Sequence, residues 1–394
     1  MKKFFFTLTL LGLMRITNAQ WIPTSLNSEN VLSLAKKGTN IFAGTNYGIY
    51  RTTNNGISWD TLNNGFPIGN PVRSMTVSGT NIFATADYAK IFLSADNGTN
   101  WINPGDTGLQ NFPAGCVFAD GANIFTSCGN IYLSVDNGIH WTVAANGLMS
   151  DYAPSFARCA SYIIAGTSDG VAITDNNGAL WTPVNNGFPY DSIGMMYPWI
   201  NSLAVSGTTI YAGTTGEGVF VTTNYGTNWD SINTGLINKN IRALAISGTN
   251  IFAGTPSGAF FSSNFGANWV SISTGLTDSS IYSFVTSGDT LFAGTGTGVW
   301  WRKISDILTG VETINGLDNI KVYPNPANDK ITLETTEMYK AAKIFIFNTQ
   351  GQMLTQQEIK QIKTDIDIKG LAKGVYILRL NSSYRTALTK FIKE

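Results

Sequence analysis

The stretch IRALAISGTNIFAGTPSGAFFSSNFGANWVSISTGL, from Ile241 to Leu276, divides into short apolar runs separated by turn residues. The runs are RALAIS, IFAGT, GAFFSS and WVSIS, and the turn SGTN separates the first two. Short runs rich in Val, Ile, Phe and Ala between Gly, Asn, Ser and Thr are typical of strands. Since no apolar period of about 3.6 residues is sustained, the stretch predicts four antiparallel strands and no helix.

A box of the form [S/T]-x-[D/N]-x-G-x-x-W lies between the third and fourth of these runs and occurs six times in the chain. The six copies end at Trp59, Trp101, Trp141, Trp181, Trp229 and Trp269, which are 42, 40, 40, 48 and 40 residues apart. A period near 40 residues with four strands in each repeat is typical of a β-propeller, in which each repeat is one blade.

A seventh unit begins at Ile281 and stops after three strands. The missing fourth strand has a match at the other end of the chain. The segment WIPTSLN, from Trp21, resembles the fourth-strand segments WDTLNNG, from Trp59, and WTPVNNG, from Trp181. A ring closed by strands from both ends leaves no open sheet edge. We therefore predict an all-β fold with a seven-bladed propeller over residues 20–305, closed by the N-terminal strand.

The G-x-x-W box resembles the Asp-box of sialidases, of propeller glycosidases that cut xyloglucan, of sortilin-type receptors and of a photosystem assembly factor. This resemblance implies that the Asp or Asn side chain bonds backbone N–H groups of the turn, that the Gly takes a φ angle unfavourable for other residues, and that the Trp packs between blades. The residues concerned are Asn54, Gly56, Trp59, Asp96, Gly98, Trp101, Asp136, Gly138, Trp141, Asn176, Gly178, Trp181, Asn224, Gly226, Trp229, Asn264, Gly266 and Trp269. Because four of the six acidic positions are Asn, we expect a structural role and neither metal binding nor catalysis there.

The first 19 residues, MKKFFFTLTLLGLMRITNA, have a basic start, a short apolar core and small residues at their end. This pattern predicts a secretory signal peptide cleaved before Gln20. The apolar core, Phe4 to Met14, is too short to span a bilayer core of about 30 Å. No later segment is longer and as apolar, so a soluble mature chain without a transmembrane segment is expected.

The C-terminal region differs in character from the repeats. Residues 306–318 predict a linker, and residues 319–394 alternate apolar and polar positions between Pro, Asn and Gly turns, which predicts a small antiparallel β-sandwich. The motif Tyr323-Pro324-Asn325-Pro326, the turn from Asn348 to Gly351, and the segment from Gly370 through Gly374 to Tyr376 resemble the type A sorting domain of the type IX secretion system of Bacteroidetes. The resemblance implies Sec export to the periplasm, contact with the type IX machinery, and transfer across the outer membrane for release or surface attachment.

Charge and cysteine content exclude several classes of function. Residues 20–305 contain 10 Lys and Arg against 15 Asp and Glu, and this acidic balance without a basic stripe does not favour nucleic acid as a partner. One His and three scattered Cys give no zinc motif and no complete disulfide framework. The aligned repeats place Ser127 opposite Cys116, which leaves a bridge between Cys116 and Cys128 open. We expect a monomer without cofactor or metal.

Chemistry is expected on the top face, which we define as the face formed by the loops between second and third strands and by the connections between blades. The boxes lie on the other rim, the box rim. The top-face residues that we select as ligand-binding candidates are Tyr88, Asp169, Tyr190, Tyr197, Trp199 and Glu217. Three of them lie in the longest connection, GFPYDSIGMMYPWINS, whose aromatic residues suit recognition of a sugar face or a protein. The alternative is that Tyr197 and Trp199 only pack over the blade junction.

An enzymatic alternative needs two carboxylates about 5–10 Å apart across a sugar substrate. Asp87, Asp169, Asp191 and Glu217 are the top-face carboxylates that could form such a pair, although their spacing in sequence does not indicate one. The arginines and the Tyr–Glu pair of sialidases have no recognisable counterpart. The leading hypothesis is therefore a non-enzymatic propeller that binds a glycan or a protein. The alternatives are an Asp-box-type glycoside hydrolase and a purely structural adhesion module.

Overall fold

The computed structural model describes residues 20–86, 90–110, 112, 114–310, 320–335, 343–348, 353–359, 361–381 and 386–394. The expected signal peptide lies outside the described residues. The chain divides into two units, the larger containing most of residues up to 310 and the smaller containing residues 311–394. Strands make up almost all of the regular structure in both units.

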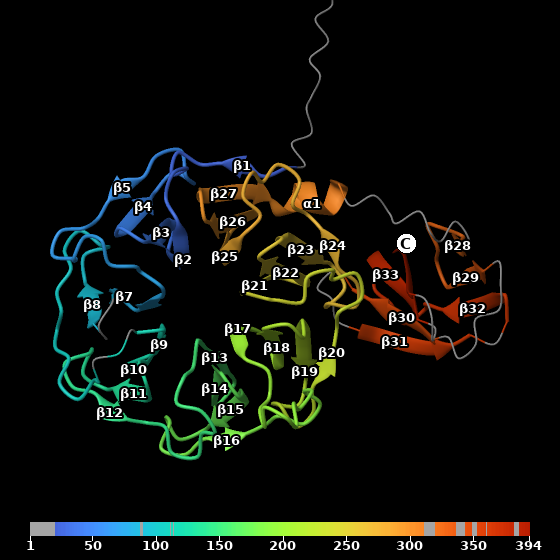
Figure 1. The fold of residues 1–394 in the computed structure, drawn as a ribbon. Coiled ribbons are helices and arrows are strands. Elements are labelled where there is room, and N and C mark those ends of the chain that lie inside the picture. The colour runs from blue at the N-terminus through green and yellow to red at the C-terminus, as the bar shows by residue number, and fades with distance from the viewer. Residues whose placement is uncertain are drawn as a thin grey trace, which may run out of the picture. The chain divides into compact units, whose positions relative to one another are not determined.

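Among the described residues, the larger unit contains seven antiparallel sheets, built from strands that follow one another in sequence except where β1 joins the last sheet. The first strands are β2 (Val31–Lys37), β6 (Met75–Ser78), β9 (Cys116–Asp120), β13 (Ser155–Cys159), β17 (Ile200–Ser206), β21 (Ala243–Ser247) and β25 (Ile281–Ser287). The second strands are β3 (Asn40–Thr45), β7 (Asn81–Ala86), β10 (Asn123–Ser127), β14 (Tyr162–Thr167), β18 (Thr209–Thr214), β22 (Asn250–Thr255) and β26 (Thr290–Thr295). The third strands are β4 (Ile49–Thr52), β8 (Lys90–Ser94), β11 (Ile131–Ser134), β15 (Gly170–Thr174), β19 (Val219–Thr222), β23 (Gly258–Ser262) and β27 (Gly298–Lys303). Figure 1 shows the sheets one after another around a centre, with the first strands innermost.

The fourth strands are the shortest and lie outermost. They are β5 (Asp60–Thr61), β12 (Thr142–Val143), β16 (Thr182–Pro183), β20 (Asp230–Ser231), β24 (Val270–Ser271) and, from the other end of the chain, β1 (Ile22–Pro23). The sheet of β6 to β8 has a single bridge in this place, between Leu93 and Ile102, whose two backbone bonds measure 2.8 and 3.0 Å.

The pairing expected from the WIPTSLN segment is present. Strand β1 pairs antiparallel with β27, with Ile22 opposite Trp301. Trp21 precedes this strand and donates its indole N–H to the backbone oxygen of Ile272 at 2.7 Å, while its backbone N–H reaches Thr274 at 3.0 Å. The last sheet is thus completed by the first described strand.

In five of the sheets, the second strand packs on the next sheet through a glycine. A Cβ added to Gly44 would lie 2.6 Å from Val72 of the next sheet, and one added to Gly213 would lie 2.6 Å from Ile241. The same relation joins the last sheet to the first, because a Cβ on Gly294 would lie 2.8 Å from Val31. Glycine is required at these positions because the aliphatic side chain that starts each following sheet occupies the space.

The core of the larger unit lies between the sheets. The second strands are buried on both faces, with patterns such as that of β3, in which every residue from Ile41 to Thr45 is buried. Such continuous apolar runs are typical of strands covered on both sides. Ser127 lies opposite Cys116 as the aligned repeats predict. The three cysteines, Cys116, Cys128 and Cys159, are buried free thiols.

A helix, α1 (Ile304–Gly310), follows β27 and occupies the start of the segment expected to be a linker. Its buried residues Ile304 and Ile307 are three positions apart, which is one helical turn. A helix of seven residues is too short to show a sustained helical period in sequence. Among the described residues, no helix is long and apolar enough to cross a membrane.

The smaller unit contains two further antiparallel sheets. One has the order β28 (Ile320–Tyr323), β29 (Lys330–Thr335) and β32 (Lys363–Asp367). The other has the order β31 (Met353–Glu358), β30 (Lys343–Phe347), β33 (Gly374–Asn381) and β34 (Thr386–Lys393). One apolar cluster draws on both sheets, including Ile331 and Leu333 from the first and Ile346, Leu378 and Phe391 from the second.

Candidate functional site

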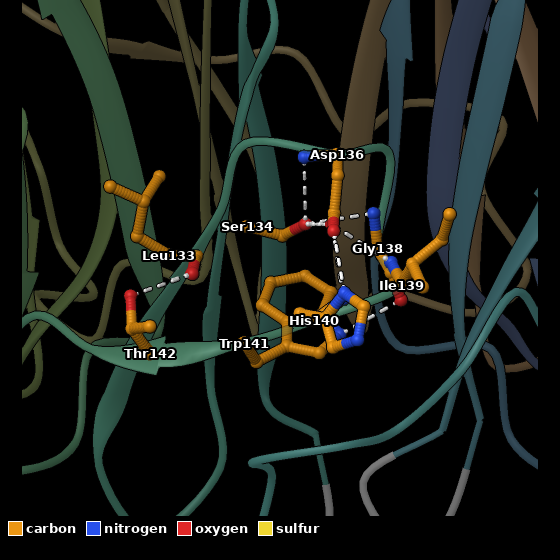
Figure 2. A network of polar contacts seen from close by, with 8 residues as sticks. All are labelled: Leu133, Ser134, Asp136, Gly138, Ile139, His140, Trp141 and Thr142. Atoms are coloured by element: carbon orange, nitrogen blue, oxygen red, sulfur yellow. Dashed lines mark hydrogen bonds and ion pairs between the residues drawn. The ribbon is translucent and has the colours of Figure 1, made fainter.

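The G-x-x-W boxes form a compact network of hydrogen bonds at the turn between third and fourth strands. Figure 2 shows the third box, in which the Ser134 hydroxyl donates to Asp136 Oδ1 at 2.8 Å and accepts the Gly138 N–H at 2.8 Å. Asp136 Oδ1 also accepts the His140 backbone N–H at 3.0 Å, and Oδ2 lies 2.8 Å from His140 Nδ1. The Trp141 indole N–H bonds the Gly138 carbonyl oxygen at 3.1 Å. The network satisfies polar groups of the turn with side chains of the same turn.

The two central bonds of this network occur in all six boxes. The Ser or Thr hydroxyl accepts the N–H of the box glycine at 2.8–3.1 Å. The Asp or Asn Oδ1 accepts the N–H four residues later at 2.9–3.1 Å. An Asn oxygen serves as well as an Asp oxygen because only an acceptor is needed.

Two successive residues of every box lie in the left-handed region. The box glycines have φ between 81 and 88°, and the residues before them have φ between 56 and 59°. Four of those preceding residues are Asn, which tolerates this region, whereas Tyr225 and Phe265 occupy it in the last two boxes. Glycine is also needed for space: a Cβ on Gly98 would lie 2.7 Å from Leu62 Cδ1.

Three of the box tryptophans link neighbouring sheets through their indole N–H groups. The indole N–H of Trp181 donates to the Ala144 oxygen at 2.8 Å, that of Trp229 to the Val184 oxygen at 2.7 Å, and that of Trp269 to the Ile232 oxygen at 2.6 Å. Each acceptor lies about one repeat earlier in the chain. Trp21 makes the equivalent bond to Ile272, so it takes the role of a seventh box tryptophan although it has no box.

The two charged boxes contain carboxylates whose acceptor capacity is used within their own turn. The bond from the His140 backbone N–H, followed by that from its side chain, lowers the pKa of Asp136 below its usual range. The bonds from the Asn100 backbone and side chain lower the pKa of Asp96. Both carboxylates are therefore ionised hydrogen-bond acceptors of their own turn.

On the top face, the structure brings together three of the residues selected from sequence. Asp169 accepts the Tyr197 backbone N–H at 2.6 Å, and the Tyr190 and Tyr197 rings lie 4.9 Å apart. The loop between them turns back on itself through two backbone bonds between Asp191 and Met196, at 3.0 and 3.2 Å. This loop carries exposed apolar side chains at its tip, with Ile193 95% exposed.

The other selected residues lie apart from this cluster. Trp199 is 46% exposed and its ring is 5.9 Å from that of Tyr152. Glu217 is exposed, and its bonds to Thr214 and Asn233 use only its backbone. Tyr88 lies outside the described residues.

A pocket of about 460 Å³ opens where the first strands begin. Its lining residues are Leu32, Arg73, Trp199, Asn201, Thr215, Asn240, Arg242 and Tyr282. Trp199 is the one residue selected from sequence that lines it. None of the lining residues is acidic, and the described residues contain no cluster of potential metal ligands.

Five of the lining residues occupy one position of the repeat, directly after the aliphatic residue that packs on the preceding sheet. They are Leu32, Arg73, Asn201, Arg242 and Tyr282. In three sheets this position is a β-bulge, because the register shifts between Val31 and Ser33, between Ile200 and Ser202, and between Ile281 and Ser283. A bulge leaves one residue outside the ladder and redirects its side chain. These residues could have been found from sequence by comparing this one position across the repeats. The spacing of the motifs does not indicate them.

The two arginines give the pocket a positive character. The Arg242 guanidinium lies 4.9 Å from the centre of the Tyr282 ring. Its Nη1 is buried without a hydrogen-bond partner. Neither Arg73 nor Arg242 belongs to the ion pairs found among the described residues. Unpaired buried donors are rare because they forfeit hydrogen bonds to water.

The motif of the C-terminal unit has a clear local role. Both peptide bonds that precede Pro324 and Pro326 are cis. Between them, Asn325 accepts the Ile392 N–H at 2.9 Å and donates to the Lys390 oxygen at 3.2 Å. Asn325 thereby ties this turn to the last strand. Tyr376, two residues after Gly374 in β33, donates its hydroxyl to the Ala372 oxygen at 2.7 Å.

The family model described as the secretion system C-terminal sorting domain matches residues 321–394. The match agrees with the resemblance of the motif around Pro324 and the position of the segment in the chain. It indicates export through the type IX secretion system to the cell surface or outside.

Solved structures of low sequence identity share the fold of the larger unit. The extracellular domain of a putative one component system from B. thetaiotaomicron has a TM-score of 0.61 at 17% identity, over 80% of this chain and 46% of that one. YCF48 bound to D1 peptide has a TM-score of 0.56 at 15% identity, over 72% and 94%. The GH74 xyloglucanase from Xanthomonas campestris has a TM-score of 0.55 at 14% identity, over 80% and 59%.

These similarities show that the fold is a β-propeller. They do not show that this chain has the activity of any of these proteins. The chain spans less than half of the first of these proteins, at 46% of its length. No curated protein matches the chain.

Proposed function

We propose that the chain is a secreted or surface-displayed β-propeller that binds a glycan or a protein through its top face without catalysis. In this proposal residues 20–305 form seven blades closed by β1, residues 306–318 link them to the sorting domain, and residues 319–394 form a small β-sandwich. The sorting domain engages the type IX machinery and directs the propeller out of the cell.

The observation that carries the binding function is the top-face pocket. It has the volume, about 460 Å³, of sites that take small ligands. It combines aromatic rings with amide, hydroxyl and guanidinium groups, which is the composition expected for recognition. Trp199 at the pocket remains 46% exposed, so a ligand would bury a large aromatic face.

The boxes have a structural role in this proposal. The bonds of the Ser, Thr, Asp and Asn side chains are internal to each turn, and the indoles of Trp181, Trp229 and Trp269 bond the preceding sheet. A function that uses the box side chains would have to break bonds that hold the turn. The binding function therefore belongs to the top face, where the repeats differ from one another.

The hydrolase alternative is not favoured by the geometry of the top face. The pocket is lined by no carboxylate. Asp169 bonds the backbone of Tyr197, and Asp191 bonds the backbone of Ile193 at 2.9 Å, so both act as loop acceptors. Of the other two carboxylates considered, Glu217 is exposed and does not line the pocket, and Asp87 lies outside the described residues.

A glycan array probed with the full chain and with a Trp199→Ala variant tests the binding function. We expect the chain to bind a subset of glycans and the variant to lose that signal, because Trp199 is the largest aromatic side chain of the pocket lining and is 46% exposed. Release of reducing sugar from a bound polysaccharide would show instead that the protein is a hydrolase. A silent array combined with binding to surface proteins, also lost in Trp199→Ala, would assign the top face to a protein partner.

Deletion of residues 319–394 tests the sorting role. The truncated protein should accumulate in the periplasm, whereas the full chain reaches the surface or the medium. An Asn325→Ala variant, which removes the bonds to β34, is a finer version of the same test. Export of the truncated protein at the normal level would contradict the sorting role without affecting the binding proposal.

A further inference from the structure

The top-face pocket concentrates positive charge in a propeller that is otherwise acidic. Residues 20–305 contain 15 acidic against 10 basic residues, yet two of those ten, Arg73 and Arg242, line the same pocket and no acidic residue does. A cleft lined by charges of one sign attracts ligands of the opposite sign. The pocket therefore favours an anion.

Arg242 is held in place before any ligand arrives. Its backbone N–H bonds the Gly254 oxygen at 2.8 Å, and the preceding Ile241 packs where a Cβ on Gly213 would stand. The guanidinium rests over Tyr282 at 4.9 Å, while Nη1 is buried without an acceptor. A guanidinium has five N–H donors in a planar fork that matches the two oxygens of a carboxylate. Because Arg242 lines the pocket and no acceptor among the described residues holds its guanidinium, the N–H groups that face the pocket are free to bond a carboxylate.

The uncharged side chains of the pocket suit the hydroxyl groups and the apolar face of a sugar ring. Asn201 Nδ2 donates to the Thr215 hydroxyl at 2.8 Å and to the Ile241 oxygen at 2.9 Å, and these bonds fix an amide whose oxygen can accept from a ligand hydroxyl. Asn240 adds a second amide to the lining. Trp199, braced by Tyr152 at 5.9 Å, offers an exposed aromatic face for the apolar face of a ring.

We propose that the pocket binds an acidic sugar, with Arg73 and Arg242 pairing the carboxylate of a uronic acid residue and Trp199 contacting its ring. This inference rests on the proposed function and names its ligand class. A uronic acid is favoured over an acidic peptide because amide and hydroxyl groups surround the arginines, as hydroxyls surround the carboxylate of a uronic acid. The two arginines stand at the same repeat position in different sheets, so the site exists only in the closed ring.

Calorimetric titration of the full chain with tetragalacturonate tests the proposal, with the tetramethyl ester as a neutral probe of the same size. We expect the acid to bind and the ester to bind at least about 10-fold more weakly, since each bond to a charged group contributes about 1.5–3 kcal/mol. Arg73→Gln and Arg242→Gln should each weaken binding of the acid by about 10- to 100-fold. Arg242→Lys should restore part of the loss, because it keeps the charge but not the planar fork.

Lys239→Gln is the matched control. It removes one positive charge from the exposed loop beside Asn240 without touching the pocket lining, so it should leave affinity for tetragalacturonate nearly unchanged. An equal loss in Lys239→Gln and Arg242→Gln would overturn a specific carboxylate site, because it would indicate general attraction of charge.

The remaining outcomes separate this inference from the proposed function. Equal binding of acid and ester, unchanged by the arginine variants, would overturn the acidic-sugar site while the glycan-binding function stands. Binding of an acidic tetrapeptide in place of tetragalacturonate, lost in Arg242→Gln, would overturn the sugar and leave an anion site for protein. No binding of any of these probes, together with a silent glycan array, would overturn both.

Discussion

The box rim and the top face are built from the same repeats, but the repeats are alike at the box rim and differ from one another at the top face. At the rim, the same two bonds recur in six boxes within a range of 2.8–3.1 Å. At the top face, a single repeat position holds Leu32, Arg73, Asn201, Arg242 and Tyr282, and one guanidinium nitrogen lacks a partner. Repetition marks the part of the molecule that stabilises it, and variation at an otherwise repeated position marks the part available for binding.

Two tryptophans make the sharpest test of this difference. Trp181, from a box, is 1% exposed, whereas Trp199, from the top face, is 46% exposed. Trp181→Ala should lower the free energy of unfolding of the propeller by about 3–5 kcal/mol, because it leaves a cavity beside Phe125 and Phe156. Trp199→Ala should change it by less than about 1 kcal/mol. Denaturant unfolding followed by tryptophan fluorescence measures both.

Trp181→Phe separates the contribution of ring packing from that of the indole hydrogen bond. It keeps much of the ring volume but loses the indole bond to Ala144, so its loss should fall between those of the two alanine variants. Equal losses for Trp181→Ala and Trp199→Ala would remove the distinction between the rim and the top face.

A smaller effect is expected inside a box. Ser134→Ala removes the hydroxyl that accepts the buried Gly138 N–H, and an unpaired buried donor costs about 1–3 kcal/mol. Thr142→Ala, in the adjacent strand of the same sheet, removes an exposed hydroxyl with one bond of 3.3 Å and should cost less than about 0.5 kcal/mol. Chemical denaturation distinguishes the two, and similar losses would mean that the box network does not brace its turn.

The smallest expected effect comes from the charge of the Asp136 carboxylate and appears in how the stability of the fold depends on pH. The folded-state pKa of Asp136 is lowered, mainly by the His140 backbone N–H. Its contribution to stability is therefore present above the unfolded pKa near 4 and is lost as the pH falls toward the folded value. Asp136→Asn should flatten the fall in unfolding midpoint between pH 5 and 2, and Asn176→Asp should steepen it. Unchanged profiles in both variants would contradict the role of the carboxylate.

The strand content, the pairing of β1 with the last sheet and the opposition of Ser127 and Cys116 could all be predicted from sequence, because each depends on the repeat alone. The pocket could not. Its lining depends on bulges at Leu32, Asn201 and Tyr282 and on side chains from distant repeats meeting at the centre, and neither is local in sequence. The aromatic content of the longest connection therefore favoured Tyr190 and Tyr197 as candidates, whose rings pack on each other, over the top-face arginines Arg73 and Arg242.

The three cysteines belong to the buried part of the molecule. Burial raises the pKa of Cys116 and of Cys128 to about 11, so neither forms appreciable thiolate at neutral pH. A thiol reagent should label the unfolded chain rapidly and the folded chain hardly at all, as mass spectrometry would show. Rapid labelling of the folded protein would contradict the burial of these side chains.

The pairing of β1 with β27 has a mechanical consequence. The propeller's first described strand and its last strand lie side by side in one sheet, joined opposite Trp300 and Trp301. A force applied between the two ends of the propeller would therefore act first on the pairing of these two strands. Resistance to such a force would depend on the bonds of Trp21 and on the backbone bonds that join residues 22–26 to β27, so we expect the sheet that completes the ring to separate first.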